Sequence, residues 1–541
     1  MTWSQFLRIV VLAGTAVACG SAVQAAAPAP AETAKKVDAA LADELFTAEV
    51  KFAPRTDDAT FLRRAWLDIV GDIPAPEHVI AFLLDRSADK RQRLVRDLLA
   101  EPQYGVNWAR YWRDVIFYRR VEDRALIAAN ALEADLSEQL NENARWDKIA
   151  AAFITAEGDV RENGATAIIM AQDGRTEETA AEVARIFLGM QIQCAQCHDH
   201  PYDRWKRDQF HELAAFFPRI GVKPLLTPTT RSFGVIASDV PGRLRKDDDG
   251  RLPQMEHFMP DLENPSARGT QMQPKFFLTS AQLPIGSPDD ERRETLAKLL
   301  THNEWFAVAA VNRMWAELAG EGFYEPVDDV GPDRDARAPA ALKELAVGFR
   351  QSGHDMKWLI ETICATEAYQ RQSRPRGEST GAVPFTANVP QPLRADQLYN
   401  AVLSALDRVD EDARAGRRRG GAYRQMQGPR AQFNLTFGYD PSDPREGIVG
   451  SIPQTLAMMN SEEVAGALAA KKSGLVRMLL EEIPADDELV AELYLRMLSR
   501  PPSDDELARA RAYAEETGDR AEATEDLAWV LMNSAEFRHR R

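Results

Sequence analysis

The sequence predicts a mainly α-helical protein in which two helical domains are joined by an irregular, partly β segment. Over much of the 541 residues, apolar side chains recur every three to four positions, and this period marks the buried face of a helix. Between about residues 220 and 288 the period disappears, and Pro, Gly and polar residues dominate, as is typical of a domain junction or a small β insertion. Hydrophobic residues make up 45% of the chain and charged residues 28%, so the protein can bury a core.

The N-terminal residues 1–27 are expected to form an export signal. A short basic start is followed by an apolar run over residues 9–18 and then by small residues, which is the order found in secretory signal peptides. The apolar run is too short to span a bilayer of roughly 30 Å as a helix. Cleavage after Ala25 would suit signal peptidase, and the alternative is a lipoprotein signal in which Cys19 is acylated. Residues 28–40 should then form a flexible leader.

The first helical domain is predicted over residues 41–220. Gly71 ends the first strong helical pattern, Pro76 can open the next helix, and Ser87 can cap the one after it. The inner faces of the successive helices are predicted at Phe61, Leu62, Ala65, Trp66, Ile69 and Val70, at Val79, Ile80 and Leu83, at Leu94, Val95, Leu98 and Leu99, at Trp108, Trp112, Val115 and Ile116, at Trp146, Ile149, Ala150 and Phe153, and at Val183, Ile186, Phe187 and Met190.

Residues 221–287 are predicted to be an irregular or β insertion. Within them, residues 243–252 have the composition of a hairpin with Asp249 and Gly250 at its turn. The three successive acids before Gly250 lack the 12-residue ligand spacing of a calcium loop. We therefore expect a solvated turn there.

The second helical domain is predicted over residues 288–541. An arginine-rich stretch interrupts it, and in an acidic exported protein we expect this stretch to be a solvated loop and not an anion site. Its members are Arg414, Arg417, Arg418, Arg419 and Arg424. The helical period is carried by Leu296, Leu299, Leu300, Val308, Val311 and Trp315, by Leu342, Leu345, Phe349, Trp358, Leu359 and Ile363, and by Leu489, Val490, Leu493, Tyr494 and Met497.

The balance of charges argues against a nucleic-acid partner. The chain has 66 Lys and Arg residues against 83 Asp and Glu residues, which gives a net charge of −17, whereas phosphate binding depends mainly on a positive surface. No segment after the export signal has 18 uninterrupted apolar residues, so no transmembrane helix is expected. The mature protein should be free or held by a lipid anchor alone.

One motif carries chemistry. Cys194 and Cys197 stand three positions apart and His198 follows directly, which is the C-x-x-C-H signature of covalent c-type haem attachment. Two thiols at this spacing can add to the two vinyl groups of one porphyrin, and the adjacent imidazole can bind the iron from the proximal side. Haem c is attached outside the cytoplasm, and the predicted export signal agrees with that. We therefore expect haem c at Cys194 and Cys197, with His198 as the proximal ligand.

Two other interpretations of the motif stay open. The two cysteines with His198, His200 and His211 offer enough sulfur and imidazole for a zinc or iron site without a porphyrin, although adjacent Cys197 and His198 would be awkward in one tetrahedral shell. Alternatively, the two cysteines form a local disulfide or redox pair, but no thioredoxin-like pattern surrounds them. For the sixth iron ligand the sequence leaves His211 and Met190 as candidates.

No other motif assigns an enzyme class. The chain contains no H-E-x-x-H, no G-x-S-x-G, no P-loop and no dinucleotide fingerprint. Asp328 and Asp329 could serve as an acid and a base, but adjacent carboxylates beside helices are more often caps or solvated charges. Catalysis is therefore left without a residue assignment.

Several blocks of the sequence resemble a known pair of families. Residues 61–76, 104–114 and 194–205 resemble the planctomycete cytochrome-type domain of unknown function. Residues 311–315, 326–331, 452–460, 495–502 and 527–537 resemble the planctomycete-specific domain that usually follows it. The resemblance implies no activity, because neither family has an established one. Since the chain lacks the separate cytochrome domain of many relatives, the resemblance implies a single haem.

The sequence thus predicts an exported, periplasmic or envelope protein that binds one c-type haem and transfers electrons to or from a separate redox partner. The alternative is a non-enzymatic scaffold or binding module in which the C-x-x-C-H motif holds zinc or iron, or is structural.

Overall fold

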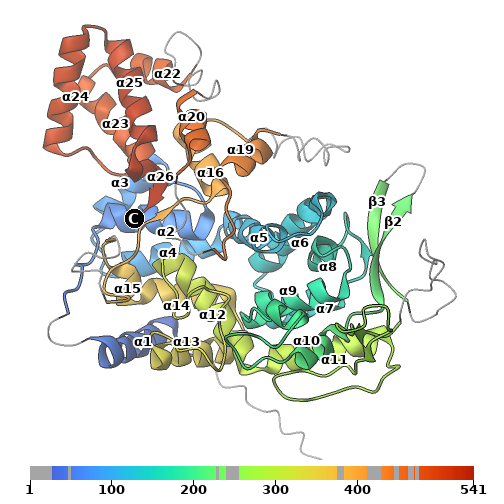
Figure 1. Cartoon of the computed structure of the whole chain (residues 1–541). Helices are drawn as coiled ribbons and strands as arrows, with labels where there is room; N and C mark the ends of the chain where they lie inside the picture. The colour runs from blue at the N-terminus through green and yellow to red at the C-terminus, as the bar shows by residue number, and fades with distance from the viewer. Residues whose placement is uncertain are drawn as a thin grey trace, which may run out of the picture.

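The computed structural model describes residues 27–46, 50–226, 231–238, 255–374, 383–410, 428–443, 450–460, 468 and 474–541. It is 59% helix and 7% strand, with small sheets between helical regions, which confirms the predicted fold class (Figure 1). Residues 1–26 of the predicted export signal, the predicted hairpin over 243–252 and the arginines between 411 and 427 lie outside the described residues. Within the described part, no helix is both long and apolar enough to cross a membrane.

The helices of the first half begin and end close to their sequence signals. The Asp57 side chain accepts a hydrogen bond from the Thr60 amide at the start of α2, and Gly71 ends α2 with φ 73°. Pro76 is the first residue of α3, but this helix buries Val79 and Phe82, and Ile80, predicted as inner, is 46% exposed. The helices are α1 Pro30–Leu45, α2 Asp58–Val70, α3 Pro76–Leu84, α4 Lys90–Ala100, α5 Pro102–Phe117, α6 Ala129–Asn141, α7 Trp146–Thr155, α8 Ala167–Ala171, α9 Thr176–Leu188 and α10 Arg207–Ala214, with 3-10 turns η1 Asp123–Ala128, η2 Gly164–Thr166 and η3 Gln193–Gln196.

Helix α1 occupies most of the segment for which a flexible leader was expected. Its Pro30 stands in the first turn, where a proline is tolerated. Ala34, Val37 and Leu41 then recur at helical spacing and are buried. The segment therefore has an apolar face, which packs against α13 and α14.

The middle of the chain contains short antiparallel sheets. Strand β3 lies between β1 and β2, and Val222 of β2 is opposite Val235 of β3. Two further pairs join β4 to β5 and β6 to β7. The strands are β1 Gly158–Asp159, β2 Ile220–Leu226, β3 Arg231–Ala237, β4 Phe258–Met259, β5 Thr270–Gln271, β6 Gln391–Pro392 and β7 His539–Arg540.

The helices of the second half form two groups, of which the later one lies at the upper left of Figure 1. Helices α16, α20, α22, α23, α25 and α26 supply most of the buried residues of a second core (below). The helices are α11 Asp289–His302, α12 Glu304–Ala319, α13 Pro339–Gln351, α14 Met356–Ala365, α15 Glu367–Gln370, α16 Ala395–Ala405, α19 Pro429–Phe437, α20 Ile452–Asn460, α22 Leu475–Glu482, α23 Asp486–Leu498, α24 Asp504–Thr517, α25 Arg520–Asn533 and α26 Ala535–Arg538.

Two hydrophobic cores hold the structure together. The first is continuous from Val37 to Phe385, so residues before and after the irregular segment share it. Its aromatic centre includes Trp112 stacked on Trp146, with ring centroids 4.4 Å apart. The second core runs from Leu393 to Phe537 and takes in two residues of the α2 region. As a result, helices far apart in the sequence pack against each other, such as α1 against α13.

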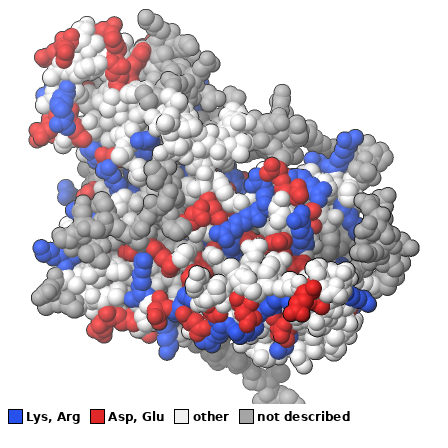
Figure 2. All heavy atoms as spheres, in the orientation of Figure 1, with Lys and Arg blue, Asp and Glu red and all other residues white. Residues whose placement is uncertain are grey.

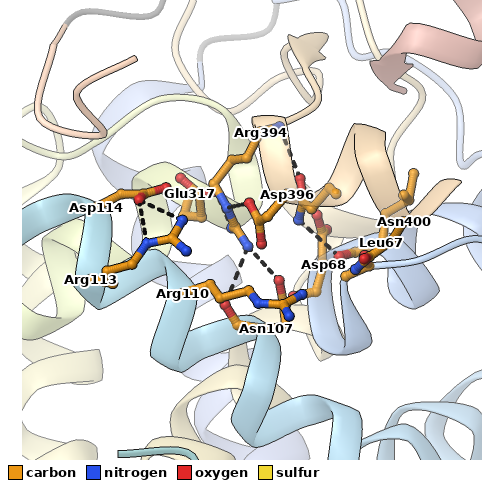
Figure 3. Close-up of polar contacts among 12 residues, drawn as sticks. Leu67, Asp68, Asn107, Arg110, Arg113, Asp114, Glu317, Arg394, Asp396 and Asn400 are labelled. Atoms are coloured by element: carbon orange, nitrogen blue, oxygen red, sulfur yellow. Dashed lines mark hydrogen bonds and ion pairs between the residues drawn. The ribbon is translucent and has the colours of Figure 1, made fainter. Parts of the chain in front are cut away.

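Buried charges join the two cores (Figure 3). The Arg394 guanidinium, at the start of α16, donates to Glu317 of α12 at 2.9 Å, to Asp396 at 3.4 Å and to the Asn107 side chain of α5. On α5, Arg113 contacts Asp114 at 2.7 Å. Charges buried with opposite partners are costly to separate, so this network fixes α5, α12 and α16 relative to one another.

The outer surface carries both signs of charge. On the face shown in Figure 2, Lys and Arg side chains are interspersed with Asp and Glu side chains. A continuous basic stripe, which a nucleic acid would need, is not seen among the described residues on that face.

Candidate functional site

The C-x-x-C-H motif lies on the turn between α9 and α10. Helix α9 ends at Gly189, whose φ of +67° is left-handed, and a Cβ there would be 2.8 Å from a methyl group of Val330. A glycine is needed at such a position because other residues rarely adopt this conformation. The chain turns at this glycine, passes through the buried Met190 and Ile192, and enters η3, which carries Cys194. We call residues 194–205 the attachment loop.

Both motif cysteines are available for chemistry. Cys194 and Cys197 are free thiols and both are exposed. Cys364 is also free but lies in α14 with only 2% of its surface exposed, and burial raises the pKa of its thiol. The two exposed thiols thus differ from a third that is confined to the core.

His198 is exposed and its orientation is partly fixed. Its Nδ1 is 2.7 Å from the carbonyl oxygen of Asp199. Because a carbonyl can only accept, Nδ1 carries a proton, and in the neutral ring Nε2 is the nitrogen with the lone pair. A metal-binding histidine commonly donates its second ring N–H to such a carbonyl. His198 therefore has the hydrogen-bonding pattern of a metal ligand.

His200 is half-buried and shapes the loop. Its amide donates to the Trp205 carbonyl at 2.8 Å, and its Nδ1 accepts from the Tyr202 amide at 3.3 Å. Trp205 in turn is buried and packs edge-on against Phe277, with centroids 5.0 Å apart. The loop is thus closed on itself and seated on the irregular middle segment.

His211 lies behind the loop, fully buried on α10. Its Nε2 is 3.0 Å from the carbonyl oxygen of Gln196, which lies between the two cysteines, and its Nδ1 is 2.8 Å from Nε2 of His257. The carbonyl can only accept, so Nε2 of His211 donates, Nδ1 accepts, and His257 donates through its Nε2. Burial lowers the pKa of His211 and of His257 to about 4, which keeps both rings neutral. This pair therefore supports the loop from inside.

The two residues predicted as candidates for the sixth iron ligand, Met190 and His211, are both buried. The backbone of Met190 forms a β-bridge with Asp329. Among the described residues, no group of three or more His, Cys, Asp or Glu side chains is arranged to hold a metal ion. Both ring nitrogens of His211 are engaged, whereas His198 keeps Nε2. The donor set of two exposed thiols and one oriented imidazole fits a c-type haem.

Asp328 and Asp329 do not face a common point. Asp328 is fully buried and forms ion pairs with Arg185 at 2.9 Å and with Arg313. Although burial raises the pKa of Asp328, Arg313 and Arg185 outweigh that effect and hold the pKa below its ordinary value. Asp329 instead contacts Arg334 at 2.8 Å. These carboxylates act as ion-pair partners.

Sequence reasoning missed His257 and Arg334. His257 is 46 residues from His211, and Arg334 is 132 residues from Tyr202, whose carbonyl it contacts. Neither residue belongs to a spaced motif. For His257, the one available signal was that the chain has only eight histidines, so each could be considered as a partner of the motif.

Comparisons with known proteins match two regions of the chain to families. No curated protein and no solved structure matches the chain. Residues 36–221 match PSCyt2, described as a protein of unknown function (DUF1549), and residues 292–432 match PSD1, described as a protein of unknown function (DUF1553). The attachment loop and His211 fall within the first region, and Arg334 falls within the second. The chain therefore belongs to the proteins that carry an N-terminal PSCyt2 domain followed by a PSD1 domain.

Proposed function

We propose that the protein binds one c-type haem covalently through Cys194 and Cys197, with His198 as the proximal ligand, and that it transfers electrons in the cell envelope. The observation that carries the proposal is the exposure of the two motif thiols and the orientation of the His198 ring. Two exposed thiols stand beside an imidazole that donates its Nδ1 proton to a carbonyl and keeps Nε2 for a metal.

The chemistry required of the chain is simple. Cys194 and Cys197 would hold the haem, each thiol adding across one vinyl group so that a C–S bond would form and the thiol hydrogen would pass to the neighbouring vinyl carbon. When bound, the haem supplies a one-electron couple between Fe(III) and Fe(II). His198 would be the protein ligand of the iron, and the Asp199 carbonyl holds its ring in one orientation.

The partner is proposed to be a separately encoded redox protein of the envelope. Haem c is attached outside the cytoplasm, and the predicted export signal would carry the chain there. The net charge of −17 favours a partner with a basic docking face.

The test is to produce the mature chain in a host that matures haem c. We expect a Soret band and haem staining that survives a denaturing gel, because the thioether bonds are covalent. The variant Cys194→Ser/Cys197→Ser should lose both signals. Cys364→Ala, which removes the buried thiol, is the matched control and should keep them. A colourless protein that contains stoichiometric zinc would exclude the haem and favour a structural metal site.

A further inference from the structure

The attachment loop is held by a segment that does not belong to the PSCyt2 domain. At the end of α9, the Val330 amide donates to the Gly189 carbonyl at 2.8 Å, and Asp329 forms a β-bridge with Met190. The segment itself is fixed, because Asp328 is buried between Arg185 and Arg313. A rigid part of the PSD1 domain therefore lies directly beside the chain that leads into the motif.

Arg334 connects this segment to the loop. Its Nε donates to Asp329 at 2.8 Å, its Nη1 donates to the Tyr202 carbonyl at 2.9 Å, and its Nη2 is 3.7 Å from the Asp203 carboxylate. Only 21% of the Arg334 side chain and 5% of the Asp203 side chain are exposed. One planar guanidinium thus spans both sides of the junction, which a lysine cannot do with a single ammonium group.

A second ion pair runs in the opposite direction. Arg204 of the loop donates through Nε to Asp333 at 2.8 Å and through Nη2 to the other oxygen of the same carboxylate. Each segment therefore gives an arginine to an aspartate of the other. Bidentate pairs of this kind add geometric specificity as well as energy. We call Asp329, Asp333 and Arg334 the outer anchor.

Hydrogen bonds within the attachment loop connect the part held by the outer anchor to His198. The His200 amide is bonded to the Trp205 carbonyl, which closes the loop just beyond Arg204. The Asp199 side chain accepts from the Arg207 amide at 3.0 Å, and the Asp199 carbonyl accepts from Nδ1 of His198. The inner face of the loop is held by His211 at the Gln196 carbonyl. The loop is therefore fixed on both faces.

We infer that the C-x-x-C-H site is composite: the PSD1 domain supplies its outer anchor, and Arg334 is a positioning residue for His198 and the two thiols. The inference concerns the loop and not the group bound to it, so only the haem arm of the test below rests on the proposed function. It assigns to the PSD1 domain a role in completing the site of its PSCyt2 neighbour.

The test compares Arg334→Lys and Arg334→Gln with a matched control. Arg337 lies on the same segment but pairs with Glu321 and Glu325, both at 3.1 Å and both away from the loop, so Arg337→Gln removes a similar set of ion pairs. In both Arg334 variants we expect hydrogen exchange of the His200 amide to speed up, on the order of tenfold in Arg334→Gln, as for loss of a charge-assisted hydrogen bond. Arg337→Gln should leave this exchange unchanged.

A second measurement tests whether Arg334 positions the His198 ring or only stabilises the attachment loop. In the haem-loaded protein, Arg334→Lys keeps the charge, so a rise in reduction potential would report a weakened His198–Asp199 hydrogen bond and a less basic ligand. If the wild type takes up no haem, the proposed function fails, and the same question is answered by the NMR shift of Nδ1 of His198 in the unloaded protein. Unchanged exchange in the Arg334 variants, an equal effect of Arg337→Gln, or an unmoved His198 signal would each overturn the inference.

Discussion

The two stacked imidazoles behind the attachment loop take their hydrogen-bond directions from one backbone carbonyl. The rings of His211 and His257 lie 5.1 Å apart between centroids and are 0% and 5% exposed. Each hydrogen bond in the series has only one allowed direction, because it ends at the Gln196 carbonyl. The Gln196 carbonyl therefore sets the tautomer of His211, and His257 supplies the proton that Nδ1 of His211 accepts.

Removing that donor should destabilise the protein. In His257→Leu, Nδ1 of His211 would be buried without a partner, at a cost of about 1–3 kcal/mol. We expect urea unfolding to show this loss in the free energy of unfolding. His302→Leu is a suitable control, since His302 is exposed on α11 and bonds only the Lys298 carbonyl within its own helix; it should change stability by less than about 0.5 kcal/mol. Equal effects of the two substitutions would argue against a stabilising role for the hydrogen bond between His257 and His211.

At the scale of elements, the contact between α5, α12 and α16 depends on one side chain. Arg394 is 3% exposed, and its partners Glu317 and Asp396 are 7% and 1% exposed. One oxygen of Asp396 already has no hydrogen-bond partner among the described residues. If Arg394 is lost, the buried carboxylates of Glu317 and Asp396 therefore lose their main cationic partner.

We expect Arg394→Met to cost about 3–5 kcal/mol, because it leaves buried carboxylates without their cation. The measurement is the free energy of unfolding from chemical denaturation. Arg477→Met provides the comparison: Arg477 pairs with Glu481 at 2.9 Å, but the two side chains are 55% and 65% exposed, and exposed pairs contribute about 0–1 kcal/mol. A similar loss in both variants would show that the junction does not depend on this cation.

The sequence located individual helices better than it located contacts between them. Asp57, Gly71 and Pro76 mark real helix ends, because capping and backbone preference act within one turn. Helix α1 was missed because its Ala- and Pro-rich composition hides a narrow apolar face, which becomes stable only against α13 and α14. The C-x-x-C-H motif was found because Cys194, Cys197 and His198 lie within five positions of the sequence. Arg334 could not be found, since its partners are set by tertiary packing.

For the whole molecule, stability should depend on pH through groups at the junction. Burial and the neighbouring Asp396 raise the pKa of Asp114 to about 6, against the opposing pull of Arg113. The ordinary value of 3.8 applies in the unfolded chain. Between these two values the folded state binds a proton that the unfolded state does not, so this group stabilises the fold increasingly as pH falls from about 6 towards 4.

Asp114→Asn should therefore be more stable than the wild type at pH 7, where the buried charge is costly, and should lose this advantage as the wild type becomes protonated. The measurement is the free energy of unfolding of both proteins at several values between pH 7 and pH 4. A difference that stays constant over this range would mean that Asp114 does not titrate there.

Helix α1 also has a consequence for the order in which the protein is made. The indole N–H of Trp358 on α14 donates to the carbonyl of Pro28 at 2.6 Å, across a sequence separation of 330 residues. Helix α1, the first helix among the described residues, therefore cannot pack against α13 and α14 until these have been synthesised. Contacts of such long range form late and slow down folding. The part of the first core that α1 supplies, Val37 and Leu41, is therefore synthesised early but can be buried only after α13 and α14 are present.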